Sequence, residues 1–190
     1  MEFAGEVDAT VRNLLAAYQN ETTAQAMYKA FAAKADEEGL GGVGSLFRAT
    51  ARAEQIHASN QARALRQSGG DARAEVERFN IGTTMENLKA ALAGEKSEIE
   101  EMYPKFAEQA AANMSAQATR AFTFAMEAEK THAELFAGAI AQIESGDTQS
   151  WVHAAREFYV CAMCAYTAAM RVDGNCPVCG YLAERFEKIS

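Results

Sequence analysis

Glutamate and histidine occur together twice in the sequence with a spacing that suits metal binding. The two motifs are Glu54-x-x-His57 and Glu129-x-x-His132. Residues three apart on an α-helix lie on one face, so each motif points a carboxylate and an imidazole in the same direction. Carboxylate oxygens and imidazole nitrogens both bind divalent transition metals. One such motif alone is common on solvated helix faces, and the argument rests on finding two.

Further carboxylates interrupt apolar helical stripes in the same way. Burying an ionised carboxylate without a partner is very costly, and the inward faces offer too few Lys or Arg residues to pair with them. Metal ions are the simplest partners, so we predict a two-metal site, most simply di-iron. Its predicted ligands are Glu21, Glu54, His57, Glu95, Glu98, Glu129 and His132.

Two tyrosines lie one to two helical turns from these ligands. Tyr28 and Tyr103 are close enough along their helices to donate hydrogen bonds to ligand carboxylates and so to tune the site. An ordinary core tyrosine explains them equally well. Other glutamates fall off the stripes, and we expect water to solvate them: Glu100, Glu101, Glu108 and Glu127.

Four long helices must position these residues. Hydrophobic periodicity predicts them at about 5–37, 43–67, 84–112 and 116–144, with Thr83-x-x-Glu86 as a capping box and Pro104 as a point for a kink or break. The predicted core face of the first helix comprises Leu14, Tyr18, Glu21, Gln25, Tyr28 and Phe31. That of the third comprises Leu88, Ala91, Glu95, Glu98, Met102 and Phe106.

The joins between these helices predict how they are connected. The first and third joins are short, which makes antiparallel neighbours, whereas the second, after Gly70, is long enough to run the length of a bundle. We therefore expect an all-α four-helix bundle of the ferritin-like kind, with one long crossover.

All four cysteines lie in the last thirty residues, as Cys161-x-x-Cys164 and Cys176-x-x-Cys179. Four thiolates at this spacing make a tetrahedral site for iron or zinc. The flanking residues resemble the two knuckles of rubredoxin, which favours iron. Gly180 follows the second knuckle as rubredoxin requires, but Ala165 replaces the first glycine, so a strained knuckle or a zinc ribbon stays open. We place the bundle at 1–147 and a rubredoxin-like metal-knuckle domain at 151–190.

Charge and hydropathy exclude several classes of function. The net charge is −8, and residues 151–190 carry as many bases as acids, so the whole excess lies in the first 150 residues. A nucleic-acid partner is not expected for such an acidic chain. No apolar run is long enough to cross a membrane, and the first residues lack a basic segment followed by an apolar stretch. We expect a cytoplasmic protein.

Over nearly its whole length the chain resembles the rubrerythrins. The resemblance rests on the ordered ligand motifs, on the extra carboxylate in Glu95-x-x-Glu98, and on the cysteine tail. It implies an oxidoreductase that reduces hydrogen peroxide to water with two Fe in the bundle and one Fe, or Zn, at the cysteines. It also implies a reductase or rubredoxin as electron donor, and a head-to-tail homodimer, domain-swapped in some members, whose electron path crosses between subunits.

The resemblance also implies a role for each ligand. Glu54 and Glu129 would bridge the two metals, Glu21 and Glu95 would each bind one of them, and His132 would hold one iron. The other iron would move between His57 when reduced and Glu98 when oxidised. Two alternatives stay open at this point: a ferroxidase that handles iron and uses oxygen, and a non-redox bundle with a zinc ribbon.

Overall fold

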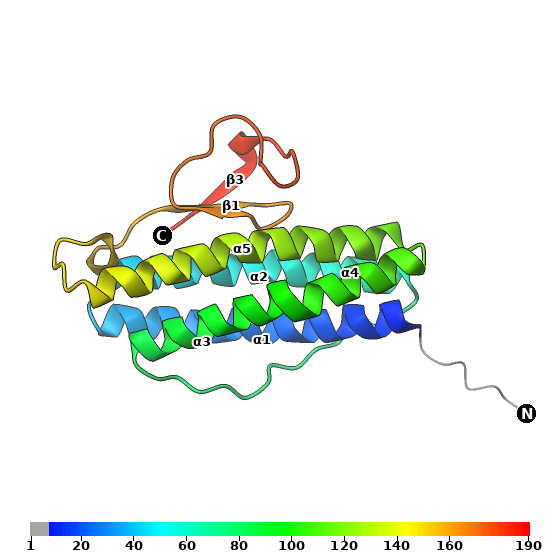
Figure 1. Cartoon of the computed structure of the whole chain (residues 1–190), viewed down its shortest axis with the longest axis horizontal. Helices are drawn as coiled ribbons and strands as arrows, with labels where there is room; N and C mark the ends of the chain where they lie inside the picture. Colours follow the sequence, from blue (N-terminus) through cyan, green and yellow to red (C-terminus); the bar gives the residue numbers. More distant parts are fainter. Residues whose placement is uncertain (1–7) are drawn as a thin grey trace, which may run out of the picture.

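The structure, a computed structural model, describes residues 8–190 and begins with a bundle of long helices (Figure 1). Asp8 caps the first helix by accepting a hydrogen bond from the Thr10 amide at 2.9 Å. The predicted start of this helix near residue 5 lies outside the described residues. The bundle elements are α1 (Ala9–Glu37), α2 (Gly41–Gln67), α3 (Thr84–Ser97), the π-helical segment η1 (Glu98–Met102), α4 (Tyr103–Ala112) and α5 (Ala116–Glu144).

The connectivity confirms the predicted bundle with one long crossover. Residues 68–83, between α2 and α3, form no regular element and run back along the outside of the bundle (Figure 1). The predicted capping box opens α3, with reciprocal hydrogen bonds between Thr83 and Glu86. The fourth predicted helix matches α5 at both ends.

The second helix begins two residues earlier than expected, at Gly41. The positive φ of Gly39 makes the turn, and the next glycines belong to the helix. A Cβ at Gly42 would overlap the backbone carbonyl of Trp151. The glycine therefore lets the segment after α5 pack directly on the start of α2.

The third helix departs from the prediction in its register. Pro104 has no N–H and its ring crowds the preceding turn, and the chain accommodates it with the wide turn η1 instead of a break. In this turn the Tyr103 N–H donates to the carbonyl of Glu98, five residues back. The wide turn adds a residue, so Tyr103 is fully buried where an α-helical period predicted Met102, and Met102 and Phe106 are only half-buried.

The buried face of α1 also differs from the predicted stripe. Tyr18 and Gln25 are half-buried and line a groove between α1 and α2. Ala17 and Ala24 take their place in the core. Small side chains let α1 approach its neighbours closely, and this leaves the larger residues at the edge of the contact.

Two apolar clusters fill the bundle on either side of the predicted ligands. One contains Tyr28, Phe31, Phe47 and Phe136, whose rings pack at centroid distances of 5.4–6.3 Å. The other is built around Leu14, Leu65, Tyr103 and Phe122. The polar residues that the sequence placed at the middle of each stripe therefore lie between two apolar regions.

The C-terminal module is a small antiparallel sheet that lies across α5 and α2 (Figure 1). Its strand order is β2 (Thr167–Ala168), β1 (Phe158–Cys161), β3 (Phe186–Ile189), with the short helices η2 (Trp151–His153) and η3 (Ala183–Arg185). Val152, Phe158 and Val160 belong to the same hydrophobic cluster as Phe47 and Phe136. Because that core is shared, the division into domains 1–147 and 151–190 stays a prediction.

Candidate metal centres

Six of the seven predicted ligands converge at the middle of the bundle. All six are buried, with at most 2% of each residue exposed. They form two groups, each with ligand atoms within 4.8 Å of one another. One group is Glu21, Glu54, His57 and Glu129, and the other is Glu54, Glu95, Glu129 and His132. Glu54 and Glu129 belong to both groups, which is the arrangement that a pair of metal ions sharing two carboxylates requires.

The chemistry of these donors suits metal cations. Several of their oxygens are fully buried without a hydrogen-bond donor, and unsatisfied buried polar atoms are rare in proteins. Divalent cations would satisfy them all at once, with carboxylate and imidazole ligands of the kind that iron accepts. The buried atoms without a hydrogen-bond partner in this cluster are Glu21 Oε2, Glu54 Oε1, Glu95 Oε2, Glu129 Oε1 and Oε2, and His132 Nδ1.

Both histidines present Nδ1 to the carboxylates and Nε2 to the C-terminal module. His57 Nδ1 lies 2.8 Å from a Glu129 oxygen, while its Nε2 lies 3.3 Å from the carbonyl oxygen of Cys164. His132 Nδ1 lies 2.6 Å from Glu129, and its Nε2 lies 3.0 Å from Thr167 Oγ1. A carbonyl can only accept, so Nε2 of His57 carries the proton and Nδ1 is left to bind metal.

Thr167 fixes the tautomer of His132 in the same way. Its hydroxyl donates to the carbonyl of Ala165 at 2.9 Å, so its lone pair is free to accept from His132 Nε2. No local sequence pattern singles out Thr167. A position two residues beyond a cysteine knuckle carries no signal until the knuckle is docked on the bundle.

Proton affinities in the cluster reflect its crowding. Burial, and then repulsion from neighbouring carboxylates, raises the pKa of Glu21 and of Glu95 well above the ordinary value. Burial alone would lower the pKa of His57 and His132, but the Glu129 carboxylate raises both well above their ordinary value. The same imidazoles outweigh burial at Glu129 and lower its pKa. Without metal, Glu21, Glu95 and both imidazoles therefore hold protons more tightly than the isolated side chains would.

A second layer of hydrogen bonds holds the outer carboxylates. The Tyr28 hydroxyl donates to Glu95 at 2.6 Å, and the Tyr103 hydroxyl donates to Glu21. The structure thus places both tyrosines beside predicted ligands. Gln61 donates to the Tyr103 oxygen at 2.9 Å and faces the same Glu21 oxygen at 3.3 Å. Its place one turn beyond His57 was visible in the sequence, but a core amide gives no specific signal.

The seventh predicted ligand, Glu98, lies apart from the other six. It starts the η1 segment, is half-buried, and belongs to neither metal group. Its Oε1 accepts a hydrogen bond of 2.7 Å from Asn20 Nδ2. Burial and then the charge of Glu129 raise the pKa of Glu98 well above its ordinary value.

The four cysteines form a compact all-sulfur group. Their sulfurs lie within 4.8 Å of one another, with Sγ–Sγ distances of 3.6 Å for Cys161–Cys179 and 3.5 Å for Cys164–Cys176. A hydrogen bond from Cys164 and backbone amides lower the pKa of Cys161 to about 5. This geometry fits one tetrahedral thiolate-bound ion.

The two knuckles share one backbone conformation. Ala165 has φ 68° and Gly180 has φ 74°, and each donates its N–H to the first cysteine of its knuckle at 2.9 Å. The predicted departure at Ala165 is therefore absorbed without a change of shape. Its methyl group packs into the bundle cluster, which offsets the cost of a left-handed alanine.

The two centres meet within a single chain. The Cys164 carbonyl contacts the His57 ring, and both residues belong to the same molecule. The resemblance implied an electron path that crosses between subunits. That path stays an expectation; within the one chain described, the Cys164 carbonyl oxygen lies 3.3 Å from His57 Nε2.

A family model described as rubrerythrin matches residues 12–140. The chain belongs to the rubrerythrin family. It is 32% identical to rubrerythrin-2 of Clostridium acetobutylicum over 92% of this chain and 93% of that protein. It is 33% identical to nigerythrin of Nitratidesulfovibrio vulgaris, over 91% of this chain and 83% of that one. A solved structure of nigerythrin in its fully reduced, all-ferrous state superposes with a TM-score of 0.84 and 31% identity, covering 97% of this chain and 89% of that chain.

Family membership confirms the ferritin-like bundle and its rubredoxin-like tail. Rubrerythrins have a carboxylate–histidine di-iron site and a four-cysteine site, and this chain carries both sets of donors. Members of the family are oxidoreductases. Among the described residues, no helix is both long enough and apolar enough to span a bilayer.

Proposed function

We propose that this protein is a peroxidase that reduces hydrogen peroxide to water with electrons delivered through its four-cysteine site. The observation that carries the proposal is the contact between Cys164 and His57, which joins a one-electron centre to a two-metal centre. The reaction consumes one peroxide, two electrons and two protons and yields two water molecules. Iron held by the clustered glutamates and histidines would supply the two electrons to the O–O bond.

The protein's own residues hold the protons that this reaction needs. The hydroxyl groups of Tyr28 and Tyr103 donate to Glu95 and Glu21, at opposite sides of the cluster. Gln61 orients the Tyr103 hydroxyl by donating to its oxygen. We propose that these tyrosines keep the terminal carboxylates oriented and return protons to the site.

Glu98 and His57 are the proposed exchanging ligands. His57 lies inside the cluster while Asn20 holds Glu98 at its edge, as expected for a reduced pair of metals. A ferric ion favours a hard anionic oxygen, whereas a ferrous ion accepts neutral imidazole. We propose that Glu98 replaces His57 on oxidation, with the seven predicted residues as the full ligand set.

The electron donor to the four-cysteine site is proposed to be a reductase or a rubredoxin, as in the family. We propose a cytoplasmic homodimer. The contact between Cys164 and His57 lies within one chain, and we propose that electrons pass between the two sites without an exchanged domain.

The proposal is tested with iron-loaded protein reduced in the absence of air. We expect stoichiometric peroxide to oxidise the reduced protein faster than oxygen does. Glu98→Ala should keep its iron but slow peroxide turnover by tenfold or more, on the order expected when a ligand used in one state is lost. Glu101→Ala is the matched control, because Glu101 is an exposed glutamate of the same η1 segment.

One observation favours a ferroxidase as the second candidate. The six converging ligands form both metal groups without Glu98. Faster oxidation by oxygen than by peroxide, together with unchanged turnover in the Glu98→Ala variant, would support the ferroxidase and contradict the peroxidase. A colourless zinc-loaded cysteine site in protein from its native source would favour the non-redox alternative.

A further inference from the structure

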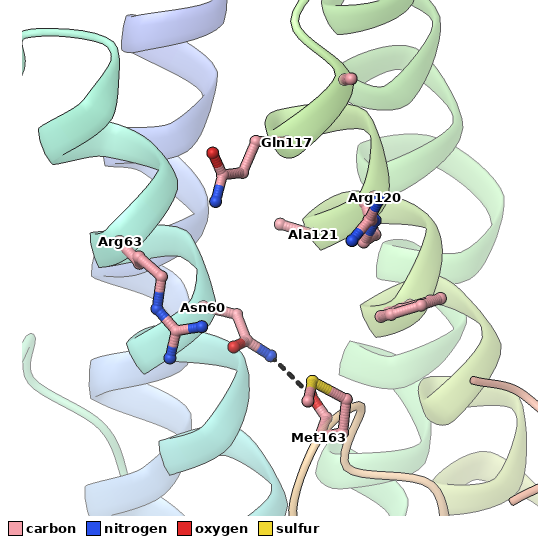
Figure 2. Close-up of a pocket in the computed structure, with 8 residues that line it drawn as sticks. Asn60, Arg63, Gln117, Arg120, Ala121 and Met163 are labelled. Carbon is pink, nitrogen blue, oxygen red and sulfur yellow. Dashed lines mark hydrogen bonds between the residues drawn. The ribbon is translucent and has the colours of Figure 1, made fainter. Parts of the chain in front are cut away.

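A pocket of about 330 Å³ opens between α2 and α5 beside the first cysteine knuckle (Figure 2). Asn60 and Arg63 form one wall, Gln117, Arg120 and Ala121 form the facing wall, and Met163 of the knuckle closes one end (Figure 2). Asn60 Nδ2 donates to the Met163 carbonyl at 2.9 Å and so fixes the knuckle against α2. The pocket is therefore bounded by two rigid helices and an anchored loop.

Positive charge dominates this pocket although the protein is acidic. Arg63 and Arg120 are exposed, and neither forms an ion pair among residues 8–190. No lining residue is a carboxylate. The first turn of α5 adds to the effect, because it has neither a side-chain cap nor an acidic residue. A chain with a net charge of −8 thus keeps two unpaired guanidinium groups facing one cavity.

The lining of the pocket also includes an aromatic ring, Phe124, and a thioether side chain, Met163. Phe124 lines the pocket and also packs against the cysteine cluster, and Met163 is 39% exposed. An adjoining hollow of about 500 Å³ shares Ala116, Arg120 and Phe124, which gives a larger ligand room to extend. A planar ring can stack on such a surface, and guanidinium groups bind phosphate through paired N–H donors.

We propose that this pocket binds a planar aromatic phosphate, of which flavin mononucleotide is the model. Arg63 and Arg120 bind the phosphate from opposite walls, and the ring lies toward Phe124 and Met163. The ligand then contacts the knuckle at Met163, which lies between Cys161 and Cys164. This binding does not depend on which oxidant the bundle uses.

Binding is measured on the full-length, metal-loaded protein by calorimetry, with flavin fluorescence as a second signal. The probes are flavin mononucleotide, riboflavin, adenosine monophosphate and inorganic phosphate. We expect flavin mononucleotide to bind roughly tenfold or more tighter than riboflavin, because the phosphate adds charge-assisted hydrogen bonds. Tighter binding of adenosine monophosphate would support the same site and assign its ring to a purine.

Variants locate the binding in this pocket. Arg63→Gln and Arg120→Gln should each weaken flavin mononucleotide about tenfold and leave riboflavin unchanged. Arg66→Gln is the matched control, since Arg66 is an exposed arginine of α2 that lies outside this pocket and also forms no ion pair among the described residues. Its affinity should equal that of the unsubstituted protein.

Gln117→Glu provides a test that does not risk the fold. An acidic residue in the first turn of α5 stabilises the helix but repels a phosphate in the pocket. We expect unchanged or higher thermal stability together with weaker flavin mononucleotide binding. Gln55→Glu, on the exposed face of α2 and hydrogen-bonded to Arg52, should leave flavin mononucleotide binding unchanged. Equal affinities for flavin mononucleotide and riboflavin, equal losses in the Arg63 and Arg66 variants, or binding of inorganic phosphate as tight as that of the nucleotides would overturn the proposal.

Discussion

Each of the two buried histidines, His57 and His132, is held at both ring nitrogens, and this decides how protons and a metal would compete for it. Glu129 faces Nδ1 of both rings, while Cys164 and Thr167 accept from the two Nε2 atoms. Without metal, the cluster stores positive charge as protons on the imidazoles and reduces negative charge by protonating carboxyl groups. Metal binding must therefore displace protons.

We expect proton release when metal-free protein takes up ferrous iron or zinc at neutral pH. The pKa of His57 and of His132 is raised, and so is that of Glu21 and Glu95, so these groups carry protons that metal binding removes. Affinity should consequently fall as pH decreases. A pH indicator in weakly buffered solution measures the release. Uptake without any proton release would contradict the assigned ligands.

Asn20 is expected to set the balance between the two positions of Glu98. Its hydrogen bond holds Glu98 outside the cluster, so Asn20→Ala should free the carboxylate to bind oxidised metal and lower the reduction potential of the pair. Loss of a hydrogen bond to a charged group corresponds to a shift on the order of tens of millivolts. Redox titration followed by the absorbance of the bundle measures it.

The control for this shift is Asn13→Ala. Asn13 lies two turns earlier on α1 and donates to Gln109, away from the ligands. If both variants shift the potential equally, the effect is a general one on helix packing, and Asn20 has no specific role at Glu98.

At the scale of elements, η1 marks the limit of what the sequence could predict. The capping box and the crossover follow from local spacing and agree with the structure, and the same spacing brings six of the seven predicted ligands together. The α-helical period then predicted Met102 in the core, because no local pattern announces a turn with one extra residue. Pro104 was the only signal. It predicted a kink or a break in the helix, but not a π-helical turn.

The contact partners of the site could not be predicted for a different reason. Thr167 is hydrogen-bonded to His132, 35 positions away in sequence, and Asn20 is hydrogen-bonded to Glu98, 78 positions away. Such pairs arise only when helices and module pack together. Ligand spacing within one helix is visible in a single sequence, whereas hydrogen bonds between elements are not.

The knuckle backbones predict how substitutions at two equivalent positions, 165 and 180, change the free energy of unfolding. Gly180 has positive φ and open space around its Cβ position, so Gly180→Ala should add only strain, about 1 kcal/mol. Ala165→Gly relieves similar strain but removes a buried methyl group, so its net effect should stay within about 1 kcal/mol. Chemical denaturation of the metal-loaded protein measures both.

Gly146→Ala is the control for strain outside the knuckle. Gly146 follows α5 with φ 70° and is equally open. It should lower the free energy of unfolding similarly without raising the reactivity of the cysteines toward a thiol reagent. Gly180→Ala places its strain directly after Cys179 and should raise that reactivity, so equal cysteine reactivity in the two variants would contradict this expectation.

At the scale of the whole molecule, an ion pair and the shared core seat the C-terminal module on the bundle. Arg52 of α2 contacts both carboxylate oxygens of Glu187 on β3, at 2.5 and 2.7 Å. The hydrogen bond from Arg52 lowers the pKa of Glu187 below its ordinary 4.5. A lowered carboxyl pKa stabilises the fold above that ordinary value, and the stabilisation is lost as pH falls through the lowered one.

We expect Arg52→Gln to cost about 0.5–1 kcal/mol at neutral pH, because the pair is partly exposed. The difference from the unsubstituted protein should persist above pH 4.5 and shrink below it. Glu187→Gln should behave alike, and the double variant should lose no more than either single one. Denaturation at several pH values measures this, with additive losses in the double variant contradicting a direct pair.

The two hydrogen bonds from the histidines to Cys164 and Thr167 also limit how this protein can change in evolution or by design. A stretch of four residues serves the thiolates on one side and the imidazoles on the other. A C-terminal module transplanted from a relative could bring all four cysteines and still leave His132 without its acceptor, unless a hydroxyl residue arrived at position 167. The Cys164 carbonyl and the Thr167 hydroxyl must therefore stay matched to the two histidines whenever the bundle or the module changes.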